Sequence, residues 1–158
     1  MSSMEGKLPQ RKRLPHEVPS AVDPVEAVFF VTVCCVERGG DFLVSESVGK
    51  GLVESVKHRN QKRVWWCSVF VVMPDHVHGL IRFGNRDAED GIGEVMKRWK
   101  AWTAREFGIR WQRGWFDHRL RSEESEREKA MYVLENPVRA GLLERWEDWG
   151  FWFVGEEG

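Results

Sequence analysis

The chain of 158 residues lacks several features that mark common classes of protein. Its three cysteines, Cys34, Cys35 and Cys67, are odd in number and show no CxxC spacing, which is typical of reduced core residues in a cytoplasmic protein. No run of about eighteen apolar residues is present to span a membrane, and residues 1–20 contain no apolar segment of signal-peptide type. We therefore expect a cytoplasmic location without a membrane partner.

The chain also lacks a charge surplus of either sign, because its formal net charge is −1. A global basic excess is therefore not available to attract nucleic acid, and any such surface depends on the local distribution of charge. Hydrophobic residues make up 42% of the sequence, which excludes a disordered chain. The length is most simply that of one domain with a sizeable core.

The composition changes near both ends. Residues 1–24 are polar and rich in proline and include a run of three basic residues, so we expect an arm without regular structure. Residues 25–154 show neither an internal repeat nor an interdomain linker and predict a single domain. An acidic tail at 155–158 follows.

Hydrophobic periodicity predicts a chain of mixed strands and helices. The polar pair Pro74-Asp75 separates two of the strands and predicts an antiparallel hairpin. Ser125 and Glu128 have the spacing of a capping box at the start of the last helix. The predicted elements are strands at 28–33, 64–73, 76–83 and 115–120, helices at 45–59, 94–107 and 122–135, and a loop at 84–93. This order predicts an α+β fold in which helices pack on a sheet.

The most informative motif is Met73-Pro74-Asp75-His76-Val77-His78-Gly79-Leu80-Ile81. His76 and His78 lie two positions apart at the start of a predicted buried strand, so their imidazoles share one face. Two neutral imidazoles on one face can bind one divalent cation if a third ligand arrives from elsewhere. The alternative is a pair of ordinary strand histidines, one in the core and one exposed.

Tyr132 is the only tyrosine in the chain, and the predicted last helix carries it. Asn136 follows four positions later, so the two side chains share a face if the helix continues. A lone tyrosine is by default a packing residue with a hydrogen-bonded hydroxyl. Asn136 precedes Pro137, so the alternative to a ligand role is an N-cap at Asn136 with Pro137 at N1 and a new short helix from Val138. Both roles can hold if the amide oxygen faces a metal.

Three motifs in this order resemble those of the REP-associated tyrosine transposases: MPDHVHGLI at 73–81, WQRGWFDHRLR at 111–121 and YVLENPVRAGLL at 132–143. These proteins belong to the single-tyrosine HUH nucleases, which process single-stranded DNA. The resemblance extends over about residues 11–149. It implies an antiparallel sheet of ferredoxin-like character, with the HUH strand central and the tyrosine helix alongside.

The resemblance also implies a chemistry. His76 and His78 would hold Mg²⁺ or Mn²⁺, with Asn136 as the third ligand, and the ion would bind the scissile phosphate. Tyr132 would then attack, leaving a 5′-phosphotyrosine link and a free 3′-hydroxyl that can later rejoin strands. The implied substrate is single-stranded DNA with hairpin-forming, REP-like repeats. We expect a monomer without an obligate protein partner.

Two positions depart from the commonest form of the HUH motif. Asp75 stands where asparagine is frequent, and it either adds negative charge near the ion or finishes the turn. Gly79 stands where a bulkier apolar residue is usual, and it lets backbone or substrate approach closely. Neither change removes a ligand.

Basic residues are concentrated between Lys97 and Arg121, where eight of them stand against two acids. Aromatic residues interleave with them, as in grooves that bind single strands. The alternative is that the rings are core and the charges form a solvated helix face. The candidate DNA contacts in the arm and in this segment are Arg11, Lys12, Arg13, Lys97, Arg98, Lys100, Arg105, Arg119 and Arg121.

His118 belongs to the second motif and is a candidate accessory residue. It either orients DNA, assists proton transfer, or pairs with Asp117 as a structural histidine. Two other classes of function stay open for the whole chain. One is a non-catalytic regulator, derived from a transposase, that binds DNA hairpins, and the other is a metal phosphoesterase without a covalent step.

Overall fold

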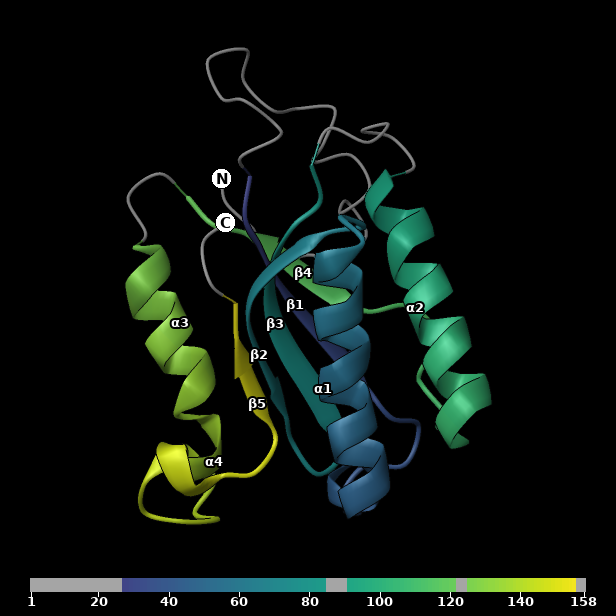
Figure 1. The fold of residues 1–158 in the computed structure, drawn as a ribbon. Helices are drawn as coiled ribbons and strands as arrows, with labels where there is room; N and C mark the ends of the chain where they lie inside the picture. Colours follow the sequence, from purple (N-terminus) through teal and green to yellow (C-terminus); the bar gives the residue numbers. More distant parts are fainter. Residues whose placement is uncertain (1–26, 85–90, 122–124, 156–158) are drawn as a thin grey trace.

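The structure is a computed structural model that describes residues 27–84, 91–121 and 125–155 (Figure 1). Its centre is a five-stranded sheet with the order β4-β1-β3-β2-β5, in which all neighbours are antiparallel. The strands are β1 (Phe29–Cys34), β2 (Trp66–Val72), β3 (His76–Arg82), β4 (Phe116–Arg119) and β5 (Trp152–Val154). The strand that carries both histidines, β3, is central as predicted.

The helices complete the α+β fold. They are α1 (Glu46–Gln61), α2 (Gly91–Phe107), α3 (Glu126–Leu134) and α4 (Asn136–Arg139), with short 3-10 turns η4 (Phe42–Val44) and η5 (Trp146–Asp148). The order β1-α1-β2-β3-α2-β4, with the sheet order β4-β1-β3-β2, is the ferredoxin-like arrangement. The predicted fold class is therefore confirmed, and β5 extends the sheet beside β2.

The two faces of the sheet carry different helices (Figure 1): α1 and α2 cover one face, and α3 lies on the other. Val77 of β3 belongs to the core beneath α1 and α2, whereas Leu80 packs with Val133 of α3. Because side chains alternate along a strand, His76 and His78 share the face of Leu80. Both histidines therefore point to the α3 side.

The predicted hairpin is confirmed, and its turn is closed by a hydrogen bond from the Met73 N–H to the His76 carbonyl (2.8 Å). Helix α1 begins after Ser45, close to its predicted start. Helix α3 begins after Ser125, whose hydroxyl accepts a hydrogen bond from the Glu128 N–H (3.2 Å), as the capping-box spacing predicts. The predicted start of that helix, at 122–124, lies outside the described residues.

One prediction about the elements is wrong, and one strand was not predicted. The predicted loop over 84–93 is helical at its end, because α2 begins at Gly91, where Ile92 packs on the core and offsets the low helix propensity of the flanking glycines. Strand β5 was not predicted, since three residues give too short a pattern to detect.

Several predictions fall on residues that the structure does not describe. They concern the basic arm at 1–24 with Arg11, Lys12 and Arg13, the loop residues 85–90, and the tail residues 156–158. Within the described ranges, no helix combines the length and the apolar character needed to cross a membrane.

Candidate metal and nucleophile site

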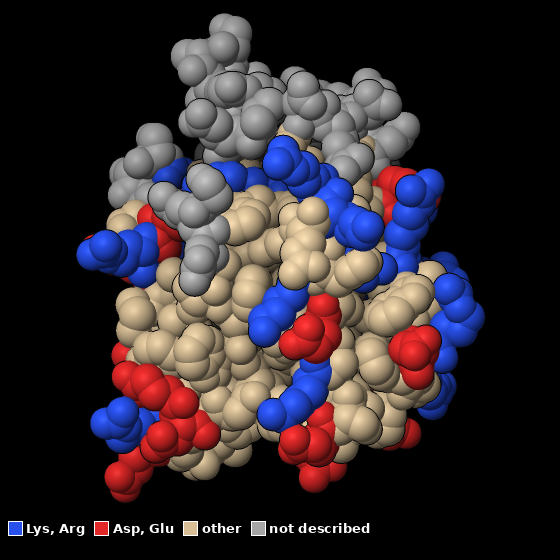
Figure 2. Space-filling view, viewed as in Figure 1, with Lys and Arg blue, Asp and Glu red and all other residues tan. Residues whose placement is uncertain are grey.

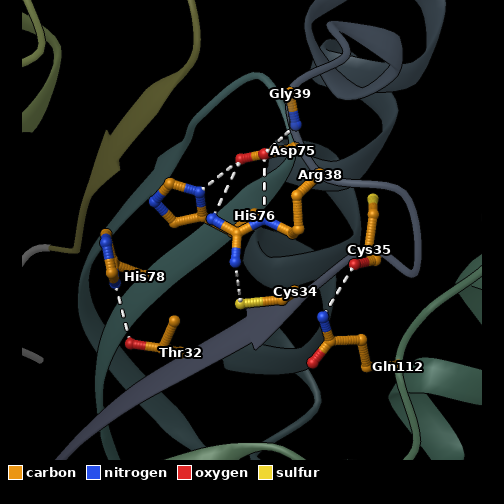
Figure 3. A network of polar contacts seen from close by, with 9 residues as sticks. All are labelled: Thr32, Cys34, Cys35, Arg38, Gly39, Asp75, His76, His78 and Gln112. Atoms are coloured by element: carbon orange, nitrogen blue, oxygen red, sulfur yellow. Dashed lines mark hydrogen bonds and ion pairs between the residues drawn. The ribbon is translucent and has the colours of Figure 1, made fainter.

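The two imidazoles lie side by side on β3, with ring centroids 4.7 Å apart and planes at 77° (Figure 3). His78 Nδ1 shares a hydrogen bond with the Thr32 hydroxyl (2.9 Å), because Thr32 is directly opposite it in the β1–β3 register. His76 Nδ1 shares a hydrogen bond with Asp75 (2.7 Å). Each ring is thus oriented through Nδ1, which makes Nε2 the nitrogen available to a metal.

Asp75 is the centre of a polar network at the turn (Figure 3). Its carboxylate accepts hydrogen bonds from Arg38 Nε (2.9 Å) and the Gly39 N–H (2.7 Å) as well as from His76. Burial raises the pKa of Asp75, but these three hydrogen bonds outweigh it and hold the pKa well below its usual range. Asp75 is therefore a carboxylate that orients His76, as outer partners of metal-binding histidines do.

Gly79 lies against the core on the face of the sheet opposite to the histidines. A Cβ at this position would meet the Phe70 ring at 3.4 Å and the Cys67 sulfur at 3.5 Å. Both neighbours belong to the core beneath α1 and α2, on the face opposite to the histidines. These distances are ordinary van der Waals contacts, so the core does not require glycine at this position. A Cβ here would point away from the histidine face, so the predicted approach of a substrate to that face does not explain the glycine either.

His78 is held in its neutral form. Burial lowers its pKa to about 3, with further contributions from the charges of His76 and Arg139. A neutral imidazole is the form that binds a metal ion, so no proton has to leave His78 near neutral pH before a metal binds.

Tyr132 lies on α3 with 49% of its surface exposed. The Arg139 guanidinium is 3.7 Å from the centroid of its ring and the Lys129 ammonium is 4.9 Å away. Lys129 also lies 5.1 Å from the Phe30 ring, which stacks on His78 with centroids 5.2 Å apart. A continuous series of side-chain contacts therefore joins the phenol to the histidine pair.

Helix α3 is fixed to the sheet at its N-terminal end. Glu126 accepts two hydrogen bonds from the guanidinium of Arg82 on β3 (2.7 and 3.1 Å) and one from the Ser68 hydroxyl on β2 (3.1 Å). Further along the helix, Val133 and Leu134 pack into the core on this face. These contacts set the position of Tyr132 relative to β3.

Asn136 is the first residue of α4, and its amide donates a hydrogen bond to the Val133 carbonyl (3.4 Å). The alternative in which Asn136 is an N-cap is wrong, because Glu135 occupies the N-cap and α4 begins two residues before Val138. Among the described residues, no hydrogen bond joins Asn136 to a histidine. In the same ranges, His, Cys, Asp and Glu side chains do not gather in threes to hold a metal.

The basic residues of α2 lie on the opposite side of the sheet from the histidines. Lys100 is used within the protein: its ammonium donates to the carbonyl oxygens of Gln112 (2.8 Å) and Gly114 (2.6 Å). Arg98 forms an exposed ion pair with Glu94 (3.1 Å). The structure therefore places four of the candidate DNA contacts away from the histidine face. They are the residues on this helix, Lys97, Arg98, Lys100 and Arg105.

The aromatic residues of this segment divide between core and surface. Trp99 is buried, and its indole N–H donates to the Ser55 hydroxyl (2.9 Å), so the core alternative is confirmed for this ring. Phe116 is 64% exposed and stands opposite Thr32 in the β1–β4 register. An exposed ring therefore lies in the same cross-strand row as Thr32 and His78.

The remaining candidate residues, on β4 and just after it, also lie on different faces of the sheet. His118 stands opposite Phe30 and shares the face of the histidine pair, whereas Asp117 points to the other face and accepts a hydrogen bond from Trp115 (3.0 Å). Arg119 stands opposite Phe29 in the β1–β4 register. Because Phe29 belongs to the core beneath α1 and α2, Arg119 lies on that face and not on the histidine face. Arg121 is exposed beyond the end of the strand.

Four residues of this site were not singled out from the sequence: Phe30, Thr32, Lys129 and Arg139. Arg139 follows Tyr132 by seven positions, a spacing that keeps two residues on one helical face and could have revealed it. The contacts of Phe30 and Thr32 depend on the pairing of β1 with β3 and β4, which lie far from β1 in the sequence and are joined to it by no hairpin turn.

Comparisons with known proteins support the fold. No protein-family model matches the chain. A solved structure, that of a REP-associated tyrosine transposase bound to a REP hairpin, aligns with a TM-score of 0.65 and 22% identity over 80% of this chain and 75% of that one. The chain shares the fold of this transposase.

Two further relatives are more distant or without a known role. An uncharacterised protein of Haemophilus influenzae (strain KW20) is 22% identical over 148 residues, which cover 72% of this chain and 81% of that protein. A candidate transposase of Deinococcus radiodurans R1 aligns with a TM-score of 0.39 and 17% identity, over 71% of this chain and 92% of that one.

Proposed function

We propose that the protein is a metal-dependent endonuclease and strand transferase for single-stranded DNA, acting on hairpin-forming, REP-like repeats through a 5′-phosphotyrosine intermediate. One observation supports this above all others. The only tyrosine of the chain lies on the same side of the sheet as two neighbouring imidazoles, and Lys129 and Phe30 connect it to them. The fold shared with a transposase that binds a REP hairpin is consistent with this substrate.

The histidine pair supports the proposal of a divalent metal ion by offering two nitrogen ligands on one face of β3. Both imidazoles are oriented through Nδ1, and His78 is neutral, so the proposal assigns their Nε2 atoms as two ligands. Asn136 is the proposed third ligand through its amide oxygen. Bound Mg²⁺ or Mn²⁺ would neutralise charge on the non-bridging oxygens of the scissile phosphate. Imidazole ligands suit Mn²⁺ better than the harder Mg²⁺, so we expect Mn²⁺ to support the higher rate.

The proposed reaction conserves the number of phosphate ester bonds. The Tyr132 oxygen forms a bond to phosphorus, the phenol loses its proton, and the bond to the 3′ oxygen breaks. The DNA then ends in a 3′-hydroxyl on one side and a phosphotyrosine link on the other. A 3′-hydroxyl can attack that link in turn, which rejoins DNA and regenerates the phenol without ATP.

Tyr132→Phe tests the covalent step, because it removes the hydroxyl and keeps the ring next to Arg139 and Lys129. We expect the wild-type protein, incubated with labelled single-stranded hairpin DNA and Mn²⁺, to form an adduct that survives denaturing electrophoresis. The variant should bind the DNA and form no adduct. Cleavage that persists in the variant would indicate a phosphoesterase, and DNA binding without cleavage by the wild type would indicate a regulator.

His76→Ala tests the metal role. We expect cleavage to fall by about a hundredfold or more, since a metal ligand is lost, while hairpin binding stays within about threefold. His58→Ala is the matched control, because His58 is an exposed imidazole on α1 and lies on the other side of the sheet. Equal cleavage rates in His76→Ala and the wild type would refute the proposed metal site.

A further inference from the structure

Tyr132 contacts two cations at once. The Arg139 guanidinium lies 3.7 Å from the ring centroid and also donates from Nη2 to the Tyr132 backbone carbonyl (2.6 Å). The Lys129 ammonium lies 4.9 Å from the same centroid. Arg139 therefore holds Tyr132 at two points, the ring and the backbone.

These two cations have no carboxylate partner within the described part of the chain. The ion pairs there involve other basic residues, such as Arg38 with Asp75, Arg82 with Glu126 and Arg98 with Glu94. Two positive charges beside one phenol attract an anion more strongly than either charge alone. Arg139 is exposed and Lys129 half-buried, so both can be reached from solvent.

The chemistry of the two side chains suits an oxyanion, and a phosphate is the oxyanion that the proposed DNA substrate would bring. A guanidinium has five N–H donors in a planar fork that matches phosphate oxygens, and the described contacts of Arg139 use one of them for the Tyr132 carbonyl. Lys129 adds an ammonium that also contacts Phe30, on the side of the histidine pair. An oxyanion bound by both would lie next to the phenolic ring and toward His78.

We propose that Arg139 and Lys129 form the binding site for the DNA phosphodiester next to the nucleophile, and that Arg139 also positions the Tyr132 ring. This inference rests on the proposed function and names the residues that would bind the substrate beside Tyr132. If the two residues are only solvated surface charges, their removal changes DNA binding no more than the removal of any other exposed charge.

Binding is measured in the Tyr132→Phe background, which prevents strand transfer and keeps the ring. Fluorescence anisotropy with a single-stranded hairpin oligonucleotide gives the affinity over a range of salt concentrations. We expect Arg139→Gln and Lys129→Gln each to weaken binding about tenfold and to reduce the slope of log K against log salt by about one. Lys50→Gln removes an exposed charge from α1, on the other face, and should change neither value.

A neutral methylphosphonate at the cleaved linkage tests the contact directly. The methylphosphonate should weaken binding by the Tyr132→Phe protein about tenfold. It should have little further effect when Arg139→Gln is added to that protein, because the phosphate charge that it removes is the one that Arg139 binds. The proposal would be overturned if the affinity losses from the methylphosphonate and from Arg139→Gln simply add and the salt slopes of the variants are unchanged. If Arg139→Gln does not fold, Lys129→Gln gives the same comparison.

Arg139→Lys, made in the protein with Tyr132 intact, tests the positioning role. The ammonium keeps the charge and loses the planar contact with the ring. We expect hairpin affinity within about threefold of the wild type and, at saturating DNA, adduct formation about tenfold slower. A rate equal to that of the wild type would overturn the positioning role.

The outcomes separate this inference from the proposed function. Adduct formation by the wild type, with unchanged salt slopes and additive methylphosphonate losses in the variants, would retain the enzyme and reject the phosphate site. Reduced salt slopes in both variants, with no adduct from the wild type, would reject the enzyme and retain a site that binds DNA phosphate.

Discussion

At the scale of single residues, the histidine pair is set for a ligand by neighbours that come from another strand or from the turn. Thr32 reaches His78 across the β1–β3 pair, and Asp75 reaches His76 from the preceding position. Arg38 in turn holds the Asp75 carboxylate. The rings therefore have fixed orientations without a metal, which would reduce the entropy lost on binding the proposed ion.

Acid should destabilise the fold through His78. Burial, His76 and Arg139 lower its pKa to about 3 from the ordinary 6.5, so between these values the unfolded chain takes up a proton that the folded chain does not. Stability is therefore complete above about pH 6.5 and is lost as the pH falls toward 3. Urea unfolding in EDTA should show a free energy of unfolding about 2 kcal/mol lower at pH 5.0 than at pH 7.5.

His78→Gln removes this titration and should flatten the dependence on pH over the same range. His58→Gln removes an exposed imidazole of α1 and should keep the wild-type dependence. If His78→Gln loses as much stability as the wild type between pH 7.5 and 5.0, another group is responsible for the acid sensitivity.

At the scale of the elements, helix α3 is the part that has to be placed correctly, because it carries Tyr132. Its N-terminal end is held by the paired hydrogen bonds between Arg82 and Glu126, each about one third exposed. We expect Glu126→Gln to lower the free energy of unfolding by about 1 kcal/mol, which allows for screening by solvent. Glu128→Gln, a neighbouring exposed acid in the same turn, should cost less than about 0.5 kcal/mol.

A double-mutant cycle isolates this ion pair from other effects of the substitutions. Arg82→Gln should cost about as much as Glu126→Gln, and the double variant should cost little more than either alone. Urea unfolding of the four proteins gives the coupling free energy. If the losses in free energy of unfolding from the two single variants add fully in the double variant, the ion pair does not hold α3 to the sheet.

The order of the elements could be predicted from periodicity and turn residues, whereas their contacts could not. The hairpin at Pro74-Asp75 and the capped start of α3 depend on neighbours in sequence, and both are confirmed. The start of α2 at Gly91 depends on packing by Ile92 from a distance, so local propensity gave the wrong answer. The placement of Lys129 near Phe30 depends on how α3 lies on the sheet.

At the scale of the whole molecule, the sheet separates two surfaces. Figure 2 shows Lys and Arg gathered over the side of α2, and acidic residues gathered near α4. The histidine pair and Tyr132 belong to the other side of the sheet from α2. The high density of basic residues in the sequence near Lys100 therefore does not mark the same surface as the HUH motif, because sequence neighbours on α2 and β4 are divided between the two faces.

This separation predicts the result of removing charge from α2. The triple variant Lys97→Gln, Arg98→Gln and Arg105→Gln removes three exposed charges and leaves the buried contacts of Lys100 intact. At saturating hairpin DNA and Mn²⁺, we expect adduct formation within about twofold of the wild type, since these residues affect only long-range attraction of DNA.

The comparison that decides the DNA path is between this triple variant and Arg139→Gln. Loss of one charge next to Tyr132 should slow adduct formation at saturating DNA more than loss of three charges on α2, because position relative to the reacting phosphate matters more than the number of charges. The reverse order would mean that the scissile strand crosses the α2 side. In that case Tyr132 and the histidine pair, on the other face, would not meet one phosphate in this arrangement of the fold.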